Sequence, residues 1–78
     1  MRFTMFVLTQ NQTGVADTSK CFGIHIVDES TVIRAYTFDG DGWMKLGKYK
    51  TVERAKEVIQ EINTALCENR VSFDMPED

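Results

Sequence analysis

The chain has 78 residues, of which 42% are apolar and 27% are charged, and its net charge is -3. This length and composition predict one globular domain over residues 1–78. The negative charge, without a lysine- or arginine-rich run, argues against binding to a nucleic-acid backbone, because that affinity comes from cations that neutralise phosphates.

The first half of the chain is predicted to form strands joined by short links. Runs of aromatic and branched residues predict four strands, at residues 3–9, 21–27, 31–38 and 43–49. The polar residues 10–20 predict a loop between the first two strands, and residues 28–30 predict a tight turn. Since the links are short, an antiparallel meander is the expected topology.

The second half is predicted to contain one helix. Apolar residues recur at helical spacing from Ala55 to Leu66, with charged and amide residues between them, which predicts an amphipathic helix over residues 52–68. Thr51 is the expected N-cap and Asn69 the expected C-terminal stop. The residues expected to pack on the sheet are Val58, Ile59, Ile62 and Leu66.

These elements predict an α+β domain with an antiparallel sheet of four or five strands and the helix on one face. The fifth strand would be residues 71–75 at a sheet edge, and the acidic tail 74–78 would fray. Large apolar residues fall on both faces of the predicted strands, but one helix covers only one face. We therefore expect a homodimer or a bound partner, the alternative being a twisted sheet with scattered exposed apolar residues.

Residues 39–42, Asp-Gly-Asp-Gly, raise the question of a calcium loop. Counting from Asp39, such a loop needs an oxygen ligand at its fifth position, glycine at the sixth and glutamate at the twelfth. The chain has Trp43, Met44 and Lys50 at those positions. Because Asp-Gly between two strands is a hairpin signal, we predict a turn and no metal site.

The motifs of known catalytic sites are missing from the sequence. Cys21 and His25 would share one strand face, opposite Phe22 and Ile24, but four residues of strand place them about 13 Å apart, too far for proton transfer. No nucleophile elbow, phosphate loop or dinucleotide fingerprint is present. We therefore expect no enzymatic activity and no cofactor.

Aromatic and basic residues are the candidates for binding. The candidate binding residues are Trp43, Tyr36, Arg34, Tyr49 and Lys45. Their rings would stack on planar groups, and their cations would pair with anions. Nucleic acid is disfavoured as a partner because few other cations accompany the rings, and the lysines also fit an edge strand that discourages pairing.

Several short sequence motifs can be recognised along the chain. They are Gln10-Asn11, Ile33-Arg34-Ala35, Leu46-Gly47-Lys48-Tyr49, Glu53-Arg54-Ala55-Lys56 and Met75-Pro76-Glu77. Together they resemble small, uncharacterised phage and prophage proteins of Gram-positive bacteria, although residues 12–20 have no counterpart there. The resemblance carries no assigned activity and no catalytic residue. It implies a small accessory protein of a phage or mobile element.

The resemblance, the acidity and the missing catalytic motifs predict a non-enzymatic, phage-derived protein that binds and modulates a host protein, such as a defence nuclease. The alternative is a small-ligand or nucleotide-binding module with a pocket at a homodimer interface.

The apolar start of the chain is too short for a signal peptide or a membrane span. With Cys21 and Cys67 as reduced thiols, we expect the protein in the cytoplasm of the bacterial host.

Overall fold

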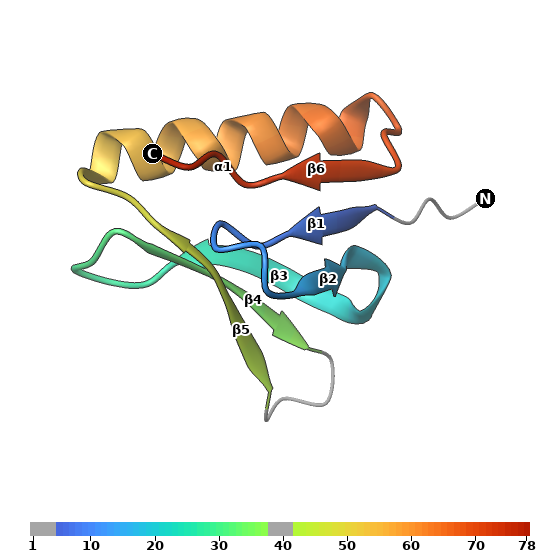
Figure 1. The fold of residues 1–78 in the computed structure, drawn as a ribbon, viewed down its shortest axis with the longest axis horizontal. Helices are drawn as coiled ribbons and strands as arrows, with labels where there is room; N and C mark the ends of the chain where they lie inside the picture. Colours follow the sequence, from blue (N-terminus) through green and yellow to red (C-terminus); the bar gives the residue numbers. More distant parts are fainter. Residues whose placement is uncertain (1–4, 38–41) are drawn as a thin grey trace.

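The computed structural model describes residues 5–37 and 42–78 (Figure 1). Its elements are β1 (Phe6–Leu8), β2 (Val15–Asp17), a 3-10 helix (Thr18–Lys20), β3 (Cys21–Ile26), β4 (Val32–Thr37), β5 (Trp43–Lys48), α1 (Val52–Cys67) and β6 (Ser72–Asp74). The protein is therefore α+β, as the sequence predicts. No helix among the described residues has both the length and the apolar character needed to cross a bilayer.

The strands form two small sheets, whereas the sequence predicts a single sheet of four or five strands. The first has the order β2-β1-β6, with β1 antiparallel to β2 and parallel to β6. The second has the order β3-β4-β5 and is antiparallel throughout. The prediction was wrong because residues 10–20 contain β2, which pairs with β1. A strand of three residues is too short for its alternation to be recognised.

A β-bulge at the start of β3 changes which side chains share a face. The register with β4 shifts there, so Phe22 and the glycine after it together lie opposite Tyr36. Phe22 consequently shares a face with His25 and not, as predicted, with Ile24. Cys21 packs against the core instead, so the prediction that it shares a face with His25 was wrong.

Both ends of α1 are confirmed where local side-chain chemistry predicts them. At the start, the Thr51 hydroxyl accepts a hydrogen bond from the Arg54 amide at 3.0 Å. At the end, Asn69 adopts a positive φ of 58°, and the Arg70 amide donates to the Ala65 carbonyl at 3.1 Å. This is a Schellman motif, which satisfies carbonyls that a helix end leaves unpaired.

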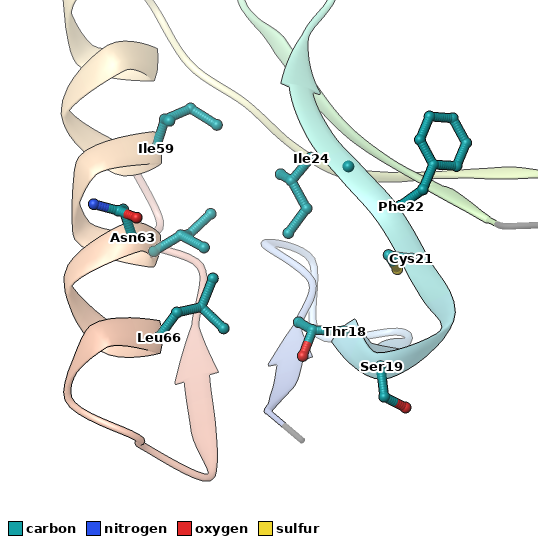
Figure 2. A pocket seen from close by; sticks show the side chains of 10 residues that line it. Thr18, Ser19, Cys21, Phe22, Ile24, Ile59, Asn63 and Leu66 are labelled. Atoms are coloured by element: carbon teal, nitrogen blue, oxygen red, sulfur yellow. The ribbon is translucent and has the colours of Figure 1, made fainter. Parts of the chain in front are cut away.

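The core lies between α1 and the inner sides of the two sheets. Its largest fully buried side chains are Met5, Ile33, Leu46, Val7 and Val58. Val58 and Ile62 are buried and Ile59 is half-buried, as predicted, but Leu66 is 41% exposed. The prediction for Leu66 was wrong because the last turn of α1 lies beside an open groove and not over the sheet (Figure 2).

Two predictions fall partly outside the described residues. The predicted turn at residues 39–42 is one, although the Gly42 carbonyl at its end accepts a hydrogen bond from the Thr37 amide at 3.1 Å. The beginning of the predicted first strand, at residues 3 and 4, is the other. The predicted last strand is confirmed as β6, at the edge of the first sheet.

Candidate functional site

One face of the second sheet is turned away from α1 and the core, and we call it the outer face. It consists of Phe22 and His25 on β3, Val32, Arg34 and Tyr36 on β4, and Trp43, Lys45 and Lys48 on β5. Figure 1 shows α1 at one end of the molecule and the β4-β5 hairpin at the other. Phe22 is 58% exposed and Trp43 is 53% exposed. Such large aromatic side chains, gathered on one open face, are typical of a binding surface.

The outer face is organised as two neighbouring rows that cross the strands. The aromatic row contains Phe22, Tyr36 and Trp43, with Tyr36 paired to Trp43 across β4 and β5. The basic row contains His25, Arg34 and Lys45, which are paired with one another in register. Because the rows are two residues apart along β4 and β5, about 7 Å separates them there.

Arg34 and Trp43 join the two rows. The guanidinium carbon of Arg34 lies 3.7 Å from the centre of the Trp43 ring. A guanidinium at this distance over an indole makes a cation–π contact. Its Nε is buried and, among the described residues, has no hydrogen-bond partner. The cation is therefore fixed beside an exposed indole.

Tyr36 is the centre of a ring cluster on the same face. Its ring centre lies 6.1 Å from that of Phe22 and 5.6 Å from that of His25, the latter edge-on. These separations are within the range of favourable aromatic pairs. A shallow hollow of about 410 Å³ beside the cluster is bordered by Val27 and Asp28 at the turn after β3.

The charges of the described residues are unevenly distributed over the protein. Strands β3, β4 and β5, all of which are described, contain Arg34, Lys45 and Lys48 but no Asp or Glu. The carboxylates of the other described elements are on β2, α1 and β6, in the C-terminal tail and at the β3-β4 turn; they include Asp17, Glu53, Glu57, Glu61, Asp74, Glu77, Asp78, Asp28 and Glu29. An acidic chain thus presents one cationic and aromatic face, which its net charge does not reveal.

Four of the five predicted binding residues are on the outer face, and Tyr49 is not. Tyr49 is only 3% exposed, and its hydroxyl donates to the Pro76 carbonyl at 2.9 Å. Burial raises its pKa to about 12, an effect that Arg54 opposes and Glu61 reinforces. Tyr49 is therefore a structural residue.

The sequence analysis did not select four residues of the outer face, namely Phe22, His25, Val32 and Lys48. Strict alternation placed Phe22 on the same face as Ile24 and opposite His25. A glycine within a predicted strand often marks a β-bulge, and Gly23 was that signal. A Cβ on Gly23 would lie 2.5 Å from Nε2 of His25, so the glycine gives the imidazole its place on the face.

Gln10 connects the two sheets and the C-terminal tail. Its backbone N–H donates to the Leu46 carbonyl at 2.8 Å, and its side-chain oxygen accepts from the backbone N–H of Lys48 at 2.8 Å. Its side-chain nitrogen donates to the Glu77 carbonyl at 2.7 Å. A Cβ on Gly47 would lie 3.1 Å from the Cβ of Gln10. The Gln-Asn, Leu-Gly-x-Tyr and Met-Pro-Glu motifs therefore meet at one structural junction.

A groove between α1 and β3 is another concave feature (Figure 2). It encloses about 370 Å³, and Ile59 and Leu66 of α1 point across it toward Ile24 of β3, while Phe22 points away. Its residues carry no formal charge. Cys21 lines it, and burial, together with the nearby Asp17, raises the pKa of this thiol.

Within residues 5–37 and 42–78, no three His, Cys, Asp or Glu residues are grouped as metal ligands would be. No family model matches the chain, and no curated protein or solved structure does.

Proposed function

We propose that this chain is a non-enzymatic binding protein and that the outer face of the second sheet is its binding surface. The observation that supports this is the aromatic row beside the basic row, exposed on a sheet without carboxylates. Aromatic side chains and arginine are the residues that most often dominate binding energy. The cations favour a partner that is negatively charged, and the rings favour one with planar or apolar groups.

The resemblance to phage and prophage proteins supplies the proposed context. In that context, the chain is an accessory protein that acts on a component of the host, in the host cytoplasm. The free thiols of Cys21 and Cys67 fit a reducing compartment. The expected modulation of a host protein stays a prediction from the resemblance.

The alternative of a small-ligand module at a homodimer interface would use the same residues, since Trp43, Tyr36 and Arg34 lie together. A two-fold interface across the outer face would, however, gather the cations of both copies in one interface, and β3, β4 and β5 contain no carboxylate to pair with them. A second apolar patch, formed by Phe6, Leu8 and Val15 on β1 and β2, carries no cation. Asp17 and Asp74 are, however, paired in register with Phe6 and Leu8, so a two-fold interface across this patch would also bring like charges together.

Capture from a bacterial lysate tests the proposed function. The wild-type chain, the outer-face variant Trp43→Ala and the control Lys56→Gln on the exposed side of α1 are immobilised in parallel. We expect a component that the wild type and Lys56→Gln retain and that Trp43→Ala loses. Equal retention by all three chains would contradict a role for the outer face.

A further inference from the structure

We propose that the outer face binds single-stranded nucleic acid, with bases on the aromatic row and phosphates along the basic row. This inference rests on the proposed function and names its partner. A single strand presents planar bases on one side and a line of negative charges on the other. The aromatic row of Phe22, Tyr36 and Trp43 lies beside the basic row of His25, Arg34 and Lys45 in the same arrangement.

The spacing of the aromatic row suits more than one base. Neighbouring strands are about 4.8 Å apart, so the row extends about 10 Å from β3 to β5. The Phe22 and Tyr36 ring centres are 6.1 Å apart, so adjacent bases can stack on separate rings. A mononucleotide would use one ring and needs a concave pocket, whereas this face is an open sheet. The bases of a duplex are already stacked within it and do not offer their faces to the rings.

The charges of the face complement a polyanion despite the net charge of -3. Arg34, Lys45 and Lys48 are the formal cations of the three strands, and no carboxylate lies among them. The carboxylates of α1 lie across the core, and at physiological salt a Debye length of about 8 Å screens them. Among residues 5–37 and 42–78, Asp28 borders the hollow beside His25 and is a carboxylate that opposes binding.

An acidic protein is the competing partner, and two features favour nucleic acid over it. Carboxylates on a protein surface are not accompanied by planar groups at a regular spacing, so an acidic partner would leave the aromatic row without matched contacts. The guanidinium carbon of Arg34 lies 3.7 Å from the centre of the Trp43 ring, so the basic row places a delocalised cation directly against the aromatic row. A guanidinium in that position suits phosphate, which it binds through a fork of donors.

Fluorescence anisotropy with labelled oligothymidylate and oligouridylate of about twelve nucleotides tests the inference, since such a length covers one binding site. We expect saturable binding whose affinity falls with salt, with a log-log slope of about -2 for three cations on a single strand. A duplex of equal length and free ATP should bind at least about tenfold more weakly.

Matched variants locate the site. Trp43→Ala and Tyr36→Ala should each weaken binding by roughly 5- to 150-fold, the effect of losing one base stack. Lys45→Gln should reduce the salt slope by about 0.7, whereas Lys56→Gln, the same change on α1, should leave the slope and affinity unaltered. Asp28→Asn should strengthen binding. Circular dichroism verifies that each variant is folded.

Several outcomes would overturn the inference. One is oligonucleotide binding that Trp43→Ala and Tyr36→Ala do not weaken, because such binding would come from charge attraction alone. Another is equal affinity for duplex. A third is the absence of oligonucleotide binding while polyglutamate binds through Arg34 and Lys45, which would leave the proposed function standing with an acidic protein as the partner. If Trp43→Ala also leaves lysate capture unchanged, the proposed function fails as well.

Discussion

The guanidinium of Arg34 on β4 lies 3.7 Å from the centre of the Trp43 ring on β5. Trp43 is paired in register with Tyr36 and not with Arg34, so this is a diagonal contact between the two rows of the outer face. Trp43 nevertheless remains 53% exposed. One side of the indole is therefore covered by a fixed cation, and much of the remaining ring surface is accessible to a ligand.

The Arg34–Trp43 contact predicts that lysine is a poor substitute for Arg34. A lysine ammonium does not lie flat on a ring, so Arg34→Lys should change the emission of Trp43 and lower the free energy of unfolding by about 0.5–1 kcal/mol. Tryptophan fluorescence during urea unfolding measures both effects. Lys48→Arg, elsewhere on β5, is the matched control. Identical emission from Arg34→Lys and the wild type would contradict the contact.

The junction at Gln10 predicts a large effect from a small polar truncation. Gln10→Ala removes the side-chain bonds to the Lys48 amide and the Glu77 carbonyl, which should lower the free energy of unfolding by about 1–3 kcal/mol. Gln60→Ala, on the exposed side of α1, should change it by less than about 0.5 kcal/mol. Equal effects of the two substitutions in urea unfolding would show that the junction is not structural.

The packing of α1 predicts unequal effects along one helix face. Ile62 is 3% exposed and Leu66 is 41% exposed. Ile62→Ala should therefore cost about 2–5 kcal/mol of unfolding free energy, as in other buried sites, and Leu66→Ala should cost clearly less. Thermal unfolding of the two variants compares them directly. A loss at Leu66 as large as that at Ile62 would mean that the groove between α1 and β3 is closed.

The buried hydroxyl of Tyr49 predicts a loss of stability at high pH. Its pKa is raised from an ordinary value of 10.0 to about 12, mainly by burial, so the folded state holds this proton more tightly than the unfolded state. Its contribution is full below about pH 10 and is lost as the pH rises toward about 12. Tyr49→Phe should show a smaller loss across that window in urea unfolding. Parallel pH profiles of the two proteins would contradict this assignment.

Features that depend on local chemistry could be predicted from the sequence. The ends of α1 follow from the Thr51 hydroxyl and from the tolerance of Asn69 for positive φ, both of which act within one turn. Strand β2 could not be predicted, because its three residues gain their pairing from β1 and have no recognisable alternation of their own. Because the prediction lacked β2, it combined the strands of the two sheets into a single sheet.

The candidate site was predictable by residue type but not by position. The ring and cation chemistry of Trp43, Tyr36 and Arg34 could be read from the sequence, whereas the face of Phe22 depends on a bulge that strict alternation ignores. From the sequence alone, Tyr49 cannot be distinguished from the aromatic residues of the outer face, because its hydrogen-bond partner Pro76 is distant in the chain. Net charge is also a sum over the chain and does not report where cations gather.

The most direct test of the central claim is an NMR titration of the isotope-labelled protein with single-stranded oligothymidylate, followed by amide and indole shifts. We predict that the largest shifts are at Phe22, Tyr36, Lys45 and the indole N–H of Trp43, on the outer face. Shifts concentrated on α1, with the outer face unchanged, would contradict the claim, as would a spectrum that does not change at all.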